Sequence, residues 1–220
     1  MSRSSNPAVR SALIDVAARL LIEEGPAAVT VRRVASEVGV STMAVYTHFE
    51  GMEKLRRAVR QEGFARLDRH LAVVRTTPDP VADLTVSGWA YARSGLQNPH
   101  LYRAMFLISP IDAADAVGGL PTFERLVELV GRCLAIGRFP TVDSAFSGAA
   151  QCWMFMHGAV TTVVSGGIGP TIIERLLPVL AETCYAGFGD DRSRAQASVR
   201  AGLHRAARLS REFAAATESS

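Results

Sequence analysis

Helix-start signals recur along this chain, and they constrain its fold more than any other feature of the sequence. Asn6-Pro7, Asp79-Pro80 and Asn98-Pro99 each place a helix-capping residue before a proline, which suits the first helical turn. Behind Asn6, apolar residues recur at helical spacing as far as Gly25-Pro26. No segment shows the alternation of apolar and polar residues that predicts a β-strand bounded by hairpin turns. The sequence therefore predicts an all-α protein.

These signals divide the chain into a small and a larger part. Residues 76–80 read Thr-Thr-Pro-Asp-Pro, which breaks the helical pattern, and we place the domain boundary there. We expect a three-helix head over 1–55, a connector helix over 52–75, a helical body over 80–212 and a mobile tail over 213–220.

Within these parts, the spacing of apolar residues and caps predicts individual helices. Thr171-x-x-Glu174 has the pattern of a capping box, and Pro178 is expected to kink the helix that this box opens. Small residues over 109–119 predict a loop. After the first helix, the predicted helices cover residues 31–38, 42–49, 52–75, 80–98, 99–107, 122–136, 142–166, 171–188 and 191–212.

Composition and charge narrow the class of protein. Hydrophobic residues make up 48% of the chain, which excludes wholesale disorder. Residues 1–75 carry 12 Lys and Arg against 8 Asp and Glu, whereas the remaining residues carry 12 against 13. This basic first third indicates a polyanionic partner. The beginning of the chain has no apolar signal-peptide core, so we expect a cytoplasmic protein.

The cysteines and the absence of known motifs argue against several kinds of chemistry. Cys133, Cys152 and Cys184 are too few and too scattered for a disulfide framework, and we expect buried, inert thiols, with redox sensing as the alternative. No spacing of Cys, His or acidic residues suggests a metal site. We find no Ser-His-Asp ordering, paired carboxylates or phosphate loop, so we expect no enzyme, no catalytic residue and no cofactor.

A run without any charged residue extends from Ser144 to Ile173, long enough to span a bilayer. The run contains Gln151, His157 and a glycine-rich break at 166–169, and no basic cluster flanks it closely. We therefore interpret it as a helix that is buried on most sides, in part by another subunit, and not as a membrane span.

Residues 30–49 have the pattern of a helix-turn-helix. Ala35 allows a close approach of a second helix, Gly39 suits the tight turn, and Val40 fills the angle between the two helices. The following helix begins at Ser41, and its first side chains would meet base edges in the major groove. The alternative is a plain three-helix bundle with Tyr46 and Phe49 in the core.

The segment from Thr30 to Leu55, with Tyr46, His48, Phe49 and Leu55 at characteristic spacing, resembles the DNA-binding signature of the TetR/AcrR family of bacterial transcriptional regulators. The resemblance covers about residues 9–60. It departs from the family at Met52, where lysine is usual, and Lys54 lies two positions further on. Either Arg56 or Arg57 would replace the missing phosphate contact, or non-specific affinity would be lower. The resemblance implies that Thr30 and Tyr46 touch phosphates, that His48 lies beside the backbone, and that Ser41, Thr42, Met43 and Thr47 face the bases. Arg32 and Lys54 complete the expected DNA-binding residues.

The body carries two further resemblances. Residues 90–106 and the pattern Trp153-x-x-x-His157-Gly158 are similar to the regulatory domain of a TetR subgroup. They imply a homodimer, formed through the helices near 142–166 and 171–188, and a small-molecule effector held inside the helical body.

The effector candidates are aromatic, thioether or polar side chains of the body, and ordinary core packing is the alternative for each. Arg93 could pair with a carboxylate of the effector or form a surface salt bridge. With few other charges among them, the candidates favour an apolar effector. They are Trp89, Arg93, Met105, Phe106, Phe123, Trp153 and His157.

From these features we expect a homodimeric repressor that an effector releases from a palindromic double-stranded DNA operator. An effector-independent regulator, a redox-sensing one and an activator remain open as alternatives, and a helical enzyme is the least favoured of them. The sequence identifies neither the effector nor the operator.

Overall fold

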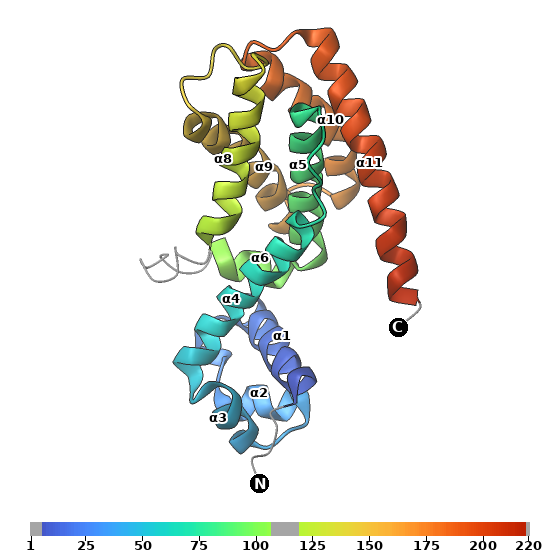
Figure 1. Cartoon of the computed structure of the whole chain (residues 1–220). Helices are drawn as coiled ribbons and strands as arrows, with labels where there is room; N and C mark the ends of the chain where they lie inside the picture. The colour runs from blue at the N-terminus through green and yellow to red at the C-terminus, as the bar shows by residue number, and fades with distance from the viewer. Residues whose placement is uncertain (1–5, 107–118, 219–220) are drawn as a thin grey trace. The chain divides into compact units, whose positions relative to one another are not determined.

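The computed structural model describes residues 6–106 and 119–218, with side chains described as far as Arg211. Within these two ranges every regular element is a helix (Figure 1), which confirms the predicted all-α class. Most of the loop predicted over 109–119 lies outside the described residues.

The chain forms two compact units. The first, called the head here, comprises the residues up to Arg66 together with Asn98–Gly119. The second, called the body, comprises Leu67–Gln97 and the residues from Leu120 onward. The head contains α1 (Pro7–Glu23), the 3-10 helix η1 (Pro26–Ala28), α2 (Val31–Val38), α3 (Thr42–Phe49), the first part of α4 (Met52–Leu71) and α6 (Pro99–Phe106).

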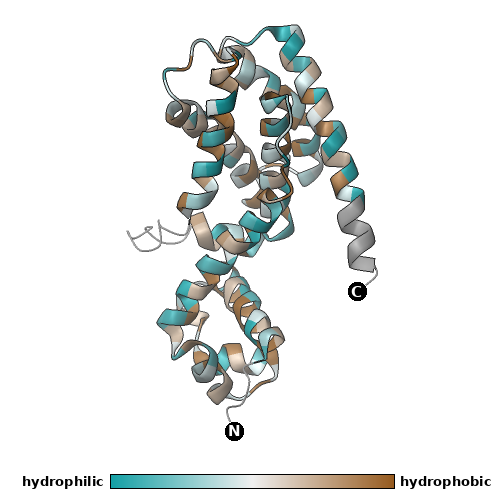
Figure 2. Cartoon of the chain, viewed as in Figure 1, coloured by the Kyte–Doolittle hydropathy of each residue, from teal (hydrophilic) through white to brown (hydrophobic). Residues whose placement is uncertain are grey.

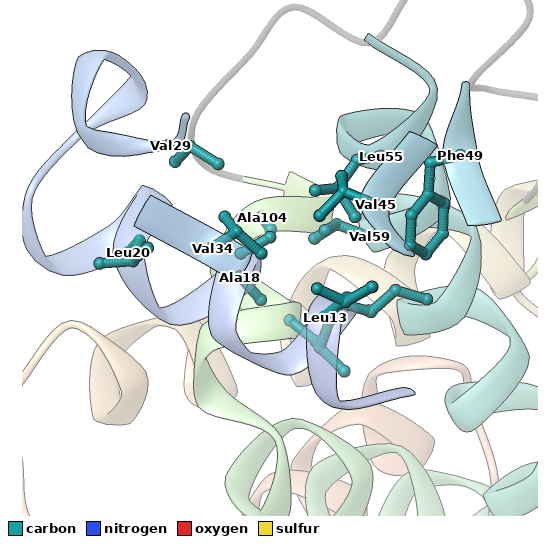
Figure 3. Close-up of a cluster of buried hydrophobic side chains, with 14 of the residues drawn as sticks. Leu13, Ala18, Leu20, Val29, Val34, Val45, Phe49, Leu55, Val59 and Ala104 are labelled. Atoms are coloured by element: carbon teal, nitrogen blue, oxygen red, sulfur yellow. The ribbon is translucent and has the colours of Figure 1, made fainter. Parts of the chain in front are cut away.

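One apolar core holds the head together (Figure 3). Leu13 of α1, Val34 of α2, Val45 of α3 and Leu55 of α4 are all fully buried in it. Helix α6 adds Leu101 and Ala104 to the same cluster. The prediction that assigned all of residues 80–212 to the body is therefore wrong for α6, because its apolar face packs with α1 of the head.

The body is built around one helix, α5 (Pro80–Gln97), which packs against α8, α9, α10 and α11. Thirteen of its residues are buried, which explains why it carries so few charges. The helices around it are α8 (Leu120–Ala135), α9 (Ala145–Val164), α10 (Pro170–Gly187) and α11 (Arg192–Glu218). Hydrophilic residues are frequent along α11 in Figure 2, as expected for a helix with one face in solvent.

A buried carboxylate ties three of these helices together. Asp83 of α5 is fully buried and pairs with Arg132 of α8 at 2.9 Å and with Arg205 of α11 at 2.7 Å. Thr77 donates to Asp83 through its backbone N–H at 2.8 Å and its hydroxyl at 2.7 Å. Burial alone would raise the pKa of Asp83, but these hydrogen bonds outweigh it and lower that pKa.

Several helix ends differ from the sequence prediction. Helix α10 begins at Pro170 after Gly169 and has no side-chain cap, so the capping box expected at Thr171 is wrong. The proline sets the start because it fits the first helical position. Helix α4 ends at Leu71 rather than Arg75, before the weak helix formers Val73 and Val74. Helix α11 extends to Glu218 through a strongly helix-forming Ala-Ala-Ala segment, beyond the predicted end at 212.

Candidate functional site

Helices α2 and α3 form a helix-turn-helix through local interactions. Thr30 caps α2 by accepting a hydrogen bond from the Arg33 N–H at 3.2 Å, and Ser41 caps α3 by accepting one from the Ala44 N–H at 3.3 Å. Between the helices, Gly39 adopts a left-handed conformation with φ of 75°, which favours glycine. The two short helices are therefore fixed at their ends by their own sequence.

Helix α3 has one buried and one exposed face. Val45 and Phe49 point into the head core, whereas the side chains of Met43 and Tyr46 are 68% and 50% exposed. Thr42 and Thr47 are exposed as well. These four positions fall on one side of the helix, because side chains three to four residues apart are neighbours. The alternative fold placed both Tyr46 and Phe49 in the core. Phe49 is buried there, whereas Tyr46 is exposed.

The hydroxyl groups near the exposed face of α3 differ in the hydrogen bonds that they can still form with a ligand. The side-chain oxygens of Thr30 and Ser41 accept hydrogen bonds as caps, so each hydroxyl hydrogen remains available to a phosphate oxygen. The Thr47 hydroxyl instead donates to the Met43 carbonyl at 2.9 Å. In this arrangement Thr47 presents an acceptor and a methyl group to a ligand, while Thr30 and Ser41 present donors.

The two arginines of α2 differ in whether acidic side chains of the head already bind them. Arg33 is engaged by Glu37 at 2.6 Å and Glu24 at 2.9 Å. Arg32, its neighbour, is exposed, and it forms no ion pair within the part of the chain that the structure describes. Arg32 is therefore more available than Arg33 for a contact with an anion, and its role in DNA binding stays a prediction.

At the start of α4, Met52 stands where a phosphate-binding lysine is expected, and three basic side chains follow it closely in sequence. Met52 is half-buried and packs against the head core, and Lys54 forms an ion pair with Glu50. Arg56 donates to the Pro26 carbonyl at 3.0 Å, whereas Arg57 is exposed. A DNA contact by Lys54 would thus compete with Glu50, and Arg57 is the better substitute.

Two features near α3, the position of Arg10 and the backbone conformation of Glu50, were not anticipated from the sequence. The guanidinium of Arg10 lies 5.4 Å from the centre of the Phe49 ring, so α1 contributes a cation beside the end of α3. His48 is half-buried, with its ring 6.0 Å from that of Phe49. Glu50 follows with a φ of 56°, an unusual value for a residue other than glycine. A positive φ at Glu50 has no signal in the local sequence.

The body contains an aromatic cluster that joins α5, α8 and α9. The Trp153 ring stacks on His157 at 5.0 Å between ring centres and meets Phe123 edge-on at 6.5 Å. Phe123 in turn packs against Phe146 at 5.4 Å. The Tyr91 hydroxyl lies 3.0 Å from His157 Nδ1. Burial lowers the pKa of His157, so the imidazole is neutral at pH 7.

The other predicted effector residues do not join this cluster. Arg93 lies over the Trp89 ring at 5.6 Å and donates to Ser210 Oγ of α11 at 2.9 Å. Met105 and Phe106 belong to the head, where Met105 packs at Gly63 and the Phe106 ring lies 5.8 Å from that of Phe64. Of the predicted set, Phe123, Trp153 and His157 form the aromatic cluster, whereas Trp89 and Arg93 pair with each other.

Helices α9 and α10 expose apolar side chains. Among the described residues the single chain does not bury the uncharged run on most sides, because several large apolar side chains of α9 are exposed; burial by another subunit stays a prediction. Gly158, on the same helix, has open space beside it. The exposed large apolar residues of the two helices are Phe146, Trp153, Met154, Phe155, Ile172, Leu176 and Val179.

Over residues 6–106 and 119–218, no helix combines the length and hydropathy that a membrane span needs, and no group of three or more His, Cys, Asp or Glu side chains could hold a metal ion.

Comparison with protein families gives two matches. Residues 13–59 match the model described as bacterial regulatory proteins, tetR family, and residues 84–182 match one described as tetracyclin repressor-like, C-terminal domain. Neither description names the Trp-x-x-x-His-Gly subgroup, which stays a prediction.

Individual relatives agree with these matches. The chain is 26% identical over 161 residues to an uncharacterized HTH-type transcriptional regulator of Mycobacterium tuberculosis, covering 71% of either protein. A tetR-family regulatory protein from Rhodococcus RHA1 has a similar fold, with a TM-score of 0.66 and 19% identity, over 80% of this chain and 96% of that one. RolR, solved with its ligand resorcinol, has a TM-score of 0.57 and 18% identity, over 87% of this chain and 93% of that one.

Proposed function

Because the chain belongs to the tetR family of bacterial regulatory proteins, which are DNA-binding transcriptional regulators and not enzymes, we propose that it is a homodimeric repressor released from its operator by a small effector. The exposed face of α3 is the observation that carries the proposal. It offers hydroxyl, phenol and thioether groups on a helix whose opposite face is locked into the head core.

Helix α3 would enter the major groove with Thr42, Met43, Tyr46 and Thr47 toward the bases and the backbone. Ser41 and Thr30 would donate their hydroxyl hydrogens to phosphate oxygens, as side chains at helix starts do in such motifs. Arg32 would add a charged phosphate contact. Two heads related by a twofold axis would read half-sites about 34–36 Å apart on a pseudo-palindromic operator.

The second copy would cover the exposed apolar faces of α9 and α10. Phe155 and Gly158 on α9, and Leu176 and Val179 on α10, recur at helical spacing on faces that the single chain leaves in water. The absence of a side chain at Gly158 would let a partner helix approach closely. A contiguous set of this kind favours a permanent interface, because apolar interfaces resemble a divided core.

The effector would bind at the aromatic cluster of Phe123, Trp153 and His157. Aromatic faces with one neutral histidine and the Tyr91 hydroxyl suit an uncharged aromatic or other mainly apolar molecule that carries a hydrogen-bonding group. RolR, similar in fold, was solved with resorcinol, a ligand of this kind. Arg93 already stacks over Trp89 and donates to Ser210 Oγ, so a carboxylate contact through it would have to replace that hydrogen bond.

The signal would reach the head through the segment between α4 and α5. Arg205 donates to the Arg75 carbonyl at 3.1 Å, and Arg132 donates to the Thr77 carbonyl at 2.5 Å, so side chains of the body hold this segment. An effector that shifted α8 or α11 would move it. A coupling of about 1–3 kcal/mol between effector and DNA is typical of allosteric proteins.

Fluorescence anisotropy with a duplex from upstream of the protein's own gene, against a scrambled duplex at about 150 mM salt, tests the DNA reader. Tyr46→Ala is expected to weaken specific binding at least tenfold, while Gln61→Ala, an exposed position of α4, should bind as the wild type does. Equal binding by Tyr46→Ala and the wild type would contradict the assignment of α3.

Sedimentation equilibrium tests the dimer separately. Gly158→Arg places a long charged side chain on the outer face of α9, where the single chain has room for it, and is expected to give monomers that remain helical by circular dichroism. Gly187→Arg, at the end of α10 where there is also open space, serves as the control. A dimer in Gly158→Arg as stable as in the control would exclude this interface.

A further inference from the structure

Two of the three cysteines meet in the core of the body, although 32 positions separate them in the sequence. Cys152 of α9 and Cys184 of α10 have their Sγ atoms 3.9 Å apart, within hydrogen-bonding distance for sulfur. Both are free thiols, Cys184 buried and Cys152 half-buried. The third thiol, Cys133 of α8, is buried in the same apolar cluster, but no contact of its sulfur with another thiol is present among the described residues.

The two thiols of the pair differ in acidity. A hydrogen bond from Cys152 lowers the pKa of Cys184, and the same bond, together with burial, raises the pKa of Cys152. Cys184 is therefore the sulfur that carries negative charge more readily, with the Cys152 S–H as its donor. Burial raises the pKa of Cys133 to about 12, so that thiol is unreactive.

We propose that Cys152 and Cys184 are a redox-active pair that closes to an intramolecular disulfide between α9 and α10 when the protein meets a hydroperoxide. The two sulfurs need to approach by about 2 Å to reach the bond length of a disulfide, which is within the reach of side-chain rotation and a small helix shift. Two cysteine sulfurs at this separation on neighbouring helices can form a disulfide without unfolding either helix.

The chemistry balances in two steps. The Cys184 thiolate attacks one oxygen of the hydroperoxide, the O–O bond breaks, and an alcohol (water, for hydrogen peroxide) leaves with the proton that Cys184 gave up, so that Cys184 becomes a sulfenic acid. The Cys152 sulfur then attacks the sulfenic sulfur, the S–S bond forms, and the hydroxyl group leaves as water with the proton of Cys152. The two thiols lose two electrons in all, and the hydroperoxide gains them.

The cross-link would join two helices that both expose apolar side chains, and one of them carries part of the aromatic cluster. Cys152 precedes Trp153 of the aromatic cluster, and α9 and α10 carry the exposed apolar faces described above. The disulfide would fix the separation of these two helices. This regulatory consequence rests on the proposed function, whereas the chemical step itself does not.

The test uses the full-length protein, reduced and freed of reductant, and then treated with hydrogen peroxide. After the remaining thiols are alkylated, peptide mass spectrometry is expected to find a Cys152–Cys184 linked peptide and the loss of two of three free thiols. Cys133→Ser should form the same linked peptide. Cys152→Ser should form none, and a sulfenic acid on Cys184 should become trappable by dimedone; circular dichroism checks that each variant is folded.

Two outcomes would overturn the proposal: wild-type protein that keeps all three thiols under peroxide, or loss of Cys133 at the same rate as the other two. Because mass spectrometry reads the bond without DNA, these results are independent of the operator. DNA binding of oxidised wild type, measured against oxidised Cys152→Ser, then reads the regulatory consequence. Equal operator affinity in these two samples would show that the disulfide does not regulate DNA binding, although the disulfide itself forms.

Discussion

Arg138 and Asp190 form a bidentate ion pair in the interior of the body. Arg138 Nε and Nη2 each donate to one carboxylate oxygen of Asp190 at 2.6 Å, and the two side chains are only 5% and 1% exposed. Ser198 Oγ accepts a further hydrogen bond from Arg138 at 3.2 Å. The pair joins the end of α8 to the turn between α10 and α11, which no local sequence pattern indicates.

Removal of one partner of this pair is expected to destabilise the protein strongly. Arg138→Met leaves the Asp190 carboxylate buried without its cation, a change that typically costs about 3–5 kcal/mol in the free energy of unfolding. Urea unfolding followed by circular dichroism measures the loss. Arg194→Ala, an exposed position on α11, should stay within about 0.5 kcal/mol of the wild type. Similar unfolding of the two variants would show that the pair contributes little.

Gly202 marks the closest approach of α11 to α5. A Cβ atom at this position would lie 2.7 Å from the Ala82 carbonyl oxygen and 2.8 Å from Thr85 Cβ. Gly202→Ala should therefore destabilise the body by about 1–3 kcal/mol, although alanine is the better helix former. Gly187→Ala, where a Cβ meets open space, is expected to be neutral or stabilising in the same thermal unfolding assay. A stabilising Gly202→Ala would contradict the close crossing.

Glu50 forms an ion pair with Lys54, and we expect this pair to limit any phosphate contact by Lys54. Glu50→Gln removes the ion pair with Lys54 and a negative charge beside α3, so it is expected to tighten DNA binding and to steepen the slope of log K against log salt by about 1. Anisotropy titrations between about 50 and 200 mM salt measure that slope. Glu53→Gln removes an exposed charge nearby but leaves the Glu50–Lys54 pair intact, and serves as the control. An identical salt slope in both variants would exclude Lys54 as a phosphate contact.

His157 makes stability depend on pH. Burial lowers the pKa of His157 in the folded chain below the ordinary value of 6.5. In mild acid the unfolded chain is therefore protonated at His157 to a greater extent than the folded chain. The folded state should lose stability as the pH falls from 6.5 toward the pKa of the folded state, with a slope of at most about 1.4 kcal/mol per pH unit. His157→Gln should lack this component. Melting temperatures of the wild type and of His157→Gln between pH 8 and pH 5 test this prediction. Parallel curves of melting temperature against pH for the two proteins would contradict it.

The head was largely predictable because its features are local. Asn6, Thr30 and Ser41 cap helices as the sequence indicates, and Gly39 adopts the left-handed turn expected of it. The buried positions of α3, Val45 and Phe49, follow from helical spacing. Local hydrogen bonds and φ preferences act within a few residues, so a sequence pattern carries them. Thr42, Met43, Tyr46 and Thr47, assigned to DNA contact on α3, are exposed for the same reason, whereas His48 is half-buried; their roles stay predictions.

The candidate effector site was predictable only in part. Trp153 and His157 are one helical turn apart, and their stacking follows from that spacing. That Phe123 and Tyr91 complete the cluster while Met105 and Phe106 pack in the head depends on which helices pack together. Many arrangements of amphipathic helices bury similar apolar area, and the sequence pattern does not choose between them.

The sequence by itself determined the helical class, most helix starts and the helix-turn-helix, because each depends on backbone preferences and contacts within one or two turns. The tertiary structure alone decided that α6 joins the head, that Arg138 meets Asp190, and that Cys152 faces Cys184. These contacts join residues that are tens of positions apart. They form only when whole helix faces pack, because specific side-chain shapes and buried charges select one packing among many.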